Sequence, residues 1–236
     1  MTCLGVIAAL PDEARCLTGR PIPTGDPANL GGDVLVQVAG LGAERTRRGA
    51  ERLLALGATA LASWGSAGGL ASDLSPGALV LPETILAEDN RKYAVDADWH
   101  ARLSKCLQDE LCIQVGMLIE STKVLATPAE KSALFAQSSA VATDMESAAV
   151  AEAARSAGVP CIVIRAIVDT ADITIPVCVT AAIDQEGQVQ RLRLLAGLLR
   201  RPTELLPVIR LGNCFRQAQM TLGKVARLAG PSLLNI

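Results

Sequence analysis

Three carboxylates stand near the ends of predicted strands, where α/β enzymes place their chemistry. Glu13 follows the first apolar run, Glu146 begins a predicted helix, and Asp169 ends the most hydrophobic run of the chain. A metal site is not expected beside them, because His100 is the only histidine and the seven cysteines show no CxxC spacing. Carboxylates without a metal suit a substrate that is rich in hydroxyl groups and whose leaving group needs a proton.

Several of these acidic residues also have a purely structural explanation. Asp144 and Asp172 have the residue type and position of helix caps or turn residues. Glu146 could be an acid in a first helical turn, where it matches the helix dipole. The single histidine argues against a Ser-His-Asp triad, because nothing else near a serine offers the base.

Glycine-rich turns follow two of the predicted strands. Residues 40–45 contain GxG, but Arg45 occupies the third glycine position of a dinucleotide fingerprint, so the match is weak. This segment indicates either a tight strand–helix turn or an anion site at a helix N-terminus, formed by Gly42 with Arg45 as the charged ligand. The second turn, residues 65–69, contains Ser66, whose hydroxyl and N–H could both donate to an oxyanion.

Alternating strands and helices must position these residues. Apolar β-rich runs predict strands at residues 4–10, 34–38, 59–64, 78–86, 114–119, 140–143 and 161–168. Helices are predicted at residues 43–56 and 145–156. Strands that alternate with helices over short connections predict a single α/β domain with a central mixed, largely parallel sheet flanked by helices.

The composition excludes several classes of protein. The chain has 236 residues, of which 50% are hydrophobic and 19% charged, with a formal net charge of −2. These values exclude a disordered chain, and the scarcity of aromatic residues argues against a single-stranded nucleic-acid binder. The charge is too even for a general duplex binder. The first apolar run has no basic region before it and leads into Asp12, so we expect a strand, no signal peptide and a cytoplasmic protein.

The last 47 or so residues differ from the rest in charge, and we divide the chain into a catalytic domain at 1–189 and a C-terminal extension at 190–236. The extension holds eight basic residues and one acidic residue, Glu204. Apolar residues at steps of three and four predict an amphipathic helix through Val208, Leu211, Phe215, Ala218, Leu222 and Val225. The favoured interpretation is a helix packed on the domain or on a second subunit. The alternative is an interfacial helix that contacts anionic lipid.

Four motifs, taken together, resemble the nucleoside phosphorylase and nucleosidase superfamily. They are GVIAALPDE at 5–13, WGSAGGL at 64–70, DMESAA at 144–149 and RAIVDTAD at 165–172. Their order and spacing make the resemblance more specific than any one motif. Within the superfamily, the Glu44-Arg45 turn, the DMES form of the third motif and the long Arg/Leu-rich tail resemble the hopanoid-associated phosphorylases. That bacterial subfamily is implicated in removing adenine from adenosylhopane to give a ribosylhopane.

The resemblance implies catalytic roles for the acids. Asp169 matches the residue that protonates or hydrogen-bonds the purine N7, so that adenine can leave, and partial burial would raise its pKa for that purpose. Met145 and Glu146 match the ribose-binding pair, in which the glutamate accepts from the sugar hydroxyls. A carboxylate there would also stabilise the positive charge that develops on the ribose as the glycosidic bond breaks.

The resemblance also implies binding positions. Gly65 and Ser66 match the loop that binds the nucleophile, while Val124 and Leu125 fall where the family holds the edge of the base. Phosphorylases of the superfamily carry an arginine three residues before the Ser66 position, and this chain has Ser63 there.

The nucleophile is where the two enzyme types differ. Glu13 aligns with the nucleosidase glutamate that activates water, which favours hydrolysis. In a phosphorylase, Arg45, Gly42 and Ser66 would bind the phosphate instead. A carboxylate beside a phosphate dianion repels it unless a cation offsets the charge, and Arg45 would be that cation.

The leading expectation is phosphorolysis of a 5′-substituted adenosine, most of all adenosylhopane, with inorganic phosphate as co-substrate and no cofactor. The alternatives are hydrolysis of methylthioadenosine or adenosylhomocysteine, and a non-catalytic nucleoside-binding protein. The expected partners are a small nucleoside, lipid-linked in the leading case, and further copies of the chain in a homo-oligomer. The tail adds the expectation of peripheral contact with the inner face of the membrane.

Overall fold

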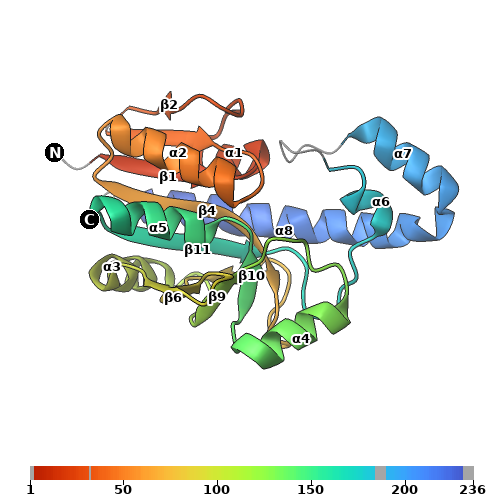
Figure 1. Ribbon diagram of the computed structural model, residues 1–236. Helices are drawn as coiled ribbons and strands as arrows, with labels where there is room; N and C mark the ends of the chain where they lie inside the picture. Colours follow the sequence, from red (N-terminus) through yellow and green to blue (C-terminus); the bar gives the residue numbers. More distant parts are fainter. Residues whose placement is uncertain (1–2, 32, 184–189, 231–236) are drawn as a thin grey trace.

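A long central strand and its parallel neighbours form the core of the protein (Figure 1). The computed structural model describes residues 3–31, 33–183 and 190–230. The central strand is β4 (Ala60–Gly69). It pairs in parallel with β1 (Leu4–Ala8) on one side and with β11 (Cys161–Ile167) on the other, and β3 (Val34–Val38) pairs in parallel with β1. The arrangement confirms an α/β domain with a mixed, largely parallel sheet.

The sheet branches at the end of β4. The pairing of β4 with β11 ends at Ala67, and the next residues, Gly68 and Gly69, pair antiparallel with β10 (Ala142–Asp144). The branch continues through β9 (Met117–Glu120), β6 (Thr84–Leu86) and β7 (Lys92–Ala94). Short strands complete the other edges: β2 (Ala28–Asn29) beside β3, and β5 (Leu79–Val80) and β8 (Ile113–Gln114) beyond β11.

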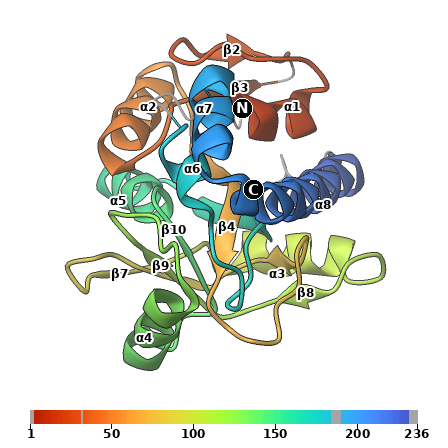
Figure 2. The ribbon, with the colours of Figure 1, turned by 90° about the vertical axis from the view of Figure 1, so that its right-hand side faces the viewer.

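Helices cover both faces of the sheet, as Figure 2 shows from one end. One face packs against α2 (Ala43–Ala55) and α5 (Ser147–Ala157), and the other against α1 (Pro11–Thr18), α3 (Ala97–Leu107) and α8 (Leu205–Ala229). The alternation of side chains along a strand explains the two layers. In β1, Leu4 and Val6 belong to the α8 side, while Ile7 belongs to the α2 side. The remaining helices are α4 (Pro128–Ser138), α6 (Val177–Thr180), α7 (Arg191–Arg200) and the 3₁₀ turn η1 (Pro202–Glu204).

The C-terminal half of α8 packs on the domain. Ala218, Leu222 and Val225 are buried in the same cluster as β1, β4 and β11. Val208, at the other end of the predicted stripe, is only partly buried, because α7 and the first turns of α8 extend beyond the sheet (Figure 1). Within the described ranges, no helix is long and apolar enough to cross a membrane.

Several predicted boundaries were wrong, each for a local reason. The first strand ends at Ala8, because Pro11 begins α1. Residues 65–69 form no turn; they continue β4, whose glycines let acidic side chains pass close to its backbone. Residues 78–86 and 114–119 each form two short strands, interrupted at Pro82 and at Gly116, which has a φ of 150°. The predicted helix at 145–156 spans Ser147–Ala157, and the helices α1, α3 and α4 are among the elements that were not predicted.

Candidate active site

The Glu13 carboxylate lies across the backbone of β4. Glu13 is in the first turn of α1, where its Oε2 accepts a hydrogen bond from the Leu10 N–H at 3.0 Å. Its Oε1 accepts from both the N–H and the hydroxyl of Ser66, at 2.8 and 2.6 Å. A Cβ atom on Gly65 would come within 2.8 Å of this carboxylate, so a residue without a side chain is needed there. Both Ser66 donors are therefore directed at Glu13.

A buried arginine faces the same part of β4. Arg165 of β11 lies opposite Gly65 in the strand register and is 3% exposed. Its guanidinium donates from Nε to Asp144 at 2.7 Å and from Nη2 to the hydroxyl of Ser63 at 2.6 Å. The same Nη2 donates to Ser147, which also donates to Asp144. The guanidinium thus joins β4, β10 and the start of α5.

Glu146 forms the opposite wall of the site. It precedes the first turn of α5, and its Oε1 accepts from the Gly42 N–H at the start of α2, at 2.9 Å. Gly42 has a φ of 98°, a conformation that favours glycine. Asp144 accepts hydrogen bonds from the N–H groups of Glu146 and Ser147, so its predicted role in a turn is correct. The same carboxylate also forms the ion pair with Arg165.

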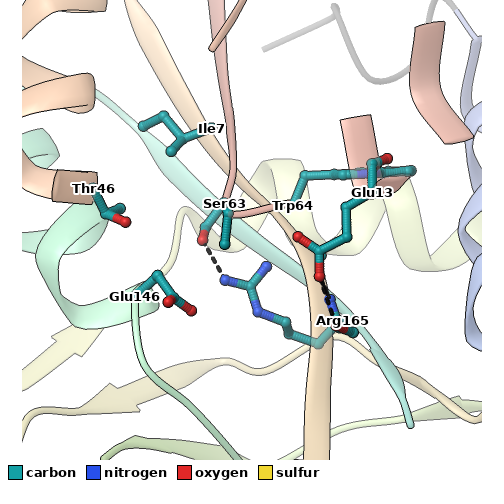
Figure 3. A pocket seen from close by; sticks show the side chains of 10 residues that line it. Ile7, Glu13, Thr46, Ser63, Trp64, Glu146 and Arg165 are labelled. Carbon is teal, nitrogen blue, oxygen red and sulfur yellow. Dashed lines mark hydrogen bonds between the residues drawn. The ribbon is translucent and has the colours of Figure 1, made fainter. Parts of the chain in front are cut away.

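These groups surround a small cavity (Figure 3). Figure 3 shows Arg165 pointing toward Ser63, with Glu13 and Glu146 on either side of it in that view. The cavity encloses about 10 Å³, which is close to the space that one water molecule needs. Thr46 of α2 also lines it, and its buried hydroxyl has no hydrogen-bond partner among the described residues. The remaining lining residues are Ile7, Ala9, Trp64, Gly65 and Ser66.

Burial sets the protonation of the acids around this cavity. It raises the pKa of Glu13, which the hydrogen bonds from Ser66 and the charge of Arg165 oppose. Burial also raises the pKa of Glu146, and the nearby charge of Asp144 adds to that effect. Glu120 pairs with Asp144 in the register of β9 and β10, and burial together with that neighbour raises its pKa to about 7. The residues that line the cavity thus place the carboxylates of Glu13 and Glu146 beside one guanidinium, that of Arg165.

A second pair of charges lies farther along β4, near its C-terminal end. Asp169 follows β11, and its carboxylate approaches Gly68 so closely that a Cβ there would be 3.3 Å away. Lys131 of α4 is 1% exposed and contacts Asp169 Oδ2 at 2.6 Å. Its Nζ also donates to the carbonyls of Thr170 and Ile173. Burial raises the pKa of Asp169, and the positive charge of Lys131 opposes this rise.

The structure places the other predicted site residues around this core. Met145 is half-buried and precedes Glu146, and Leu125 is buried while Val124 is 44% exposed. Arg45 is half-buried in the first turn of α2 and lies outside the set of residues that line the cavity. Glu13, Gly65, Ser66 and Glu146 line one cavity, whereas Asp169 lies outside it. The phosphate-ligand role of Arg45 and Gly42 remains a prediction.

Comparison with known proteins identifies the family of the chain. The family model of the phosphorylase superfamily matches residues 5–201. The chain belongs to the phosphorylase superfamily. No curated protein sequence matches the chain.

Solved structures with the superfamily fold resemble the chain over almost its whole length. The 5′-methylthioadenosine/S-adenosylhomocysteine nucleosidase of Helicobacter pylori is 17% identical with a TM-score of 0.72, covering 100% of this chain and 99% of that one. The corresponding nucleosidase of Neisseria meningitidis is 16% identical with a TM-score of 0.72, covering 97% and 99%. Futalosine hydrolase of H. pylori is 18% identical with a TM-score of 0.69, covering 99% and 97%. At this identity, the likeness shows a shared fold.

Two charged residues that the structure places at the site were not identified from the sequence. Arg165 was noticed only as part of a motif, although a charged residue in the most hydrophobic strand requires a buried partner. Lys131 lies in an ordinary helical segment, AEKSALF, and its sequence gives no sign that the side chain is buried. Only the placement of α4 beside the loop after β11 brings it to Asp169.

Replacing Gly65 with alanine is expected to lower activity strongly while leaving the chain folded. The new Cβ would overlap the Glu13 carboxylate, so that side chain must leave its place against Ser66. We expect a loss of at least about tenfold in kcat, because misplacing a reacting group by about 1 Å costs up to 100-fold. The measurement is steady-state turnover in the reaction proposed below, together with circular dichroism. A control is Gly212→Ala in α8, where nothing lies within 4 Å of the added Cβ.

Proposed function

We propose that this superfamily member hydrolyses the N-glycosidic bond of a 5′-substituted adenosine and releases adenine. The observation that carries the proposal is the use of both Ser66 donors by the Glu13 carboxylate, beside a cavity of about 10 Å³. A phosphate dianion at this place would need those donors and would face the charge of Glu13. A water molecule needs only a small polar space, which the cavity offers. The nucleosidases and the hydrolase that share the fold support the same choice.

The proposed reaction uses the three acids in separate roles. Glu13 accepts a proton from water as the water oxygen bonds to C1′ of the ribose. The bond from C1′ to N9 of adenine breaks, and Asp169 gives a proton to N7, so that the base leaves neutral. Glu146 accepts hydrogen bonds from ribose hydroxyls and stabilises the positive charge that develops on the sugar. Arg165 holds Asp144 and Ser63 in place beneath these groups.

The 5′ substituent that we propose is a large apolar group, of which the hopane of adenosylhopane is the example. Asp169 is followed along the chain by α6 and α7, where large apolar side chains are exposed, including Val177 at 52% and Leu192 at 83%. Such a surface can hold an apolar substituent outside a small polar site. We therefore expect a long alkylthio group at the 5′ position to give a higher kcat/KM than a methylthio group.

Phosphorolysis is the second candidate, and Arg45 is the observation that favours it. This arginine lies in the first turn of α2, where the helix dipole and a cation together suit an anion. Arg45 is three residues after Gly42, whose N–H donates a hydrogen bond to Glu146.

Adenine release with and without phosphate separates the two reactions. We expect equal rates in the two conditions and free ribose derivative as the product, identified by mass. Glu13→Gln is expected to lower the rate by about 100- to 10,000-fold, because it removes the general base. Asp12→Asn, at an exposed neighbouring position, is the control and should change little. Strict dependence on phosphate, with a ribose 1-phosphate product, would overturn hydrolysis in favour of phosphorolysis.

A further inference from the structure

The part of the chain that extends beyond the sheet carries a dense group of exposed apolar side chains. We call it the α7–α8 ridge and define it by Leu192, Leu195, Leu199, Leu205, Leu206 and Ile209. Three of these leucines, at 192, 199 and 206, are 83%, 85% and 77% exposed. Exposed apolar side chains that gather on one part of a protein surface mark a site of interaction.

The ridge is a fixed feature of the fold. Leu192, Leu195 and Leu199 follow one another at steps of three and four and therefore share one face of α7. The opposite face packs on α6, where a Cβ on Gly197 would come within 2.7 Å of the Cys178 Cβ. The 3₁₀ turn η1 is also attached to α6, because Glu204 accepts from the Cys178 N–H at 2.9 Å. These contacts hold the leucine face away from the domain.

Basic side chains border the ridge. Arg193 and Arg200 of α7 are exposed. Arg201 and Arg210, with side chains 55% and 68% exposed, are close to Glu204 and Asp172, so the two arginines of α7 carry most of the argument. Apolar side chains on one face with arginines beside them are the pattern of helices that lie in the headgroup region of a membrane. Arginine can place its aliphatic part against lipid while its charged end reaches the phosphates.

We propose that the α7–α8 ridge docks onto a lipid bilayer whose surface carries anionic headgroups. The charge of the surrounding arginines complements such a surface. A second copy of this chain seated on the same face in a two-fold arrangement would instead bring like charges together. α6 lies between the ridge and the loop that follows Asp169, so docking holds that loop close to the membrane (Figure 1). The proposal is independent of the nucleophile, and because Leu192 is also offered above to the 5′ substituent, the test is made without substrate.

Vesicle flotation tests the proposal with the full chain and no substrate. We expect binding to vesicles of phosphatidylcholine with phosphatidylglycerol, weaker binding to phosphatidylcholine alone, and a loss of binding as the salt concentration rises. The double variant Leu192→Glu/Leu199→Glu should lower the bound fraction at least tenfold. Arg193→Glu/Arg200→Glu should remove the preference for the anionic vesicles.

Met220→Glu is the matched control, because Met220 is 69% exposed on α8 but lies about 16 Å along that helix from Ile209. It should bind vesicles as the wild type does, and thermal unfolding should be similar for all variants. Equal binding by the wild type and the leucine variant would overturn the proposal. So would a wild-type dimer in light scattering that becomes a monomer in Leu192→Glu/Leu199→Glu, combined with no vesicle binding, because the ridge would then be a subunit interface.

Discussion

Asp169→Asn is expected to lower kcat for adenine release by about 100- to 10,000-fold, the usual contribution of a general acid. The amide can still donate a hydrogen bond to N7, but it has no proton to transfer to the departing base. Burial raises the pKa of Asp169, which favours the protonated form that this role needs. The measurement is kcat for the variant and the wild type, with the affinity for an unreactive nucleoside analogue measured in parallel. A variant that keeps its affinity and loses turnover supports a catalytic acid, whereas unchanged turnover would contradict it.

The stability of that variant must be separated from its activity. Lys131 is buried and its ammonium contacts Asp169 at 2.6 Å, so at a pH where Asp169 is ionised, Asp169→Asn leaves a buried charge with two carbonyl partners among the described residues. Removing one partner of a buried pair costs about 3–5 kcal/mol. The double variant Asp169→Asn/Lys131→Met removes the charge as well and should recover part of this stability. It should remain inactive, since the acid is still missing; recovered turnover would show that Asp169 acts only through stability.

The pH profile provides an independent check on the same assignment. Glu13 must be ionised to accept a proton, and burial raises its pKa, so activity should decline as the pH falls below that value. Asp169 must be protonated, and its pKa is raised as well, so activity should decline as the pH rises above that value. The two limbs give a bell-shaped profile. In Asp169→Asn, the residual activity should lose the alkaline limb and keep the acidic one.

The sequence predicts the positions of the acids better than their surroundings. The carboxyl ends of parallel strands meet at one edge of a sheet, so Glu13 after β1 and Ser66 near the carboxyl end of β4 are expected to be close, and the structure brings their side-chain oxygens to 2.6 Å. Asp169 follows β11 in the same way, but its partner does not follow from the pattern. Lys131 is about 40 residues away on a helix whose sequence suits an exposed surface, and only tertiary packing buries it.

The glycine run shows a second limit of sequence interpretation. Glycines commonly mark turns, so residues 65–69 were predicted as a turn after a strand. The structure continues the strand through them, because Gly65 and Gly68 leave room for the carboxylates of Glu13 and Asp169. A glycine in a strand interior can mark the close approach of another group, and sequence alone does not distinguish that from a turn. The α7–α8 ridge was likewise not predicted, because exposure depends on which face of α7 packs against α6.

Arg165→Met is expected to destabilise the protein by about 3–5 kcal/mol, the cost of removing one partner of a buried ion pair. Asp144 has a side chain that is 1% exposed, and among the residues that the structure describes its cationic partner is this guanidinium. The substitution also leaves the hydroxyls of Ser63 and Ser147 without this donor. Urea unfolding measures the difference, and Arg91→Met is the control. Arg91 has a side chain that is 49% exposed and pairs at the surface with Asp89 and Glu152, so its loss should cost no more than about 1 kcal/mol.

A further variant shows whether the cost comes from the uncompensated charge or from lost packing. Arg165→Met/Asp144→Asn removes both charges of the ion pair and should recover stability relative to Arg165→Met, because Asp144 is then no longer an uncompensated buried carboxylate. Arg165→Lys keeps the charge but cannot reach Asp144, Ser63 and Ser147 together, since lysine lacks the planar arrangement of donors. We expect it to lie between the wild type and Arg165→Met. If Arg165→Met costs less than about 1 kcal/mol, the guanidinium does not hold β4, β10 and α5 together as the contacts indicate.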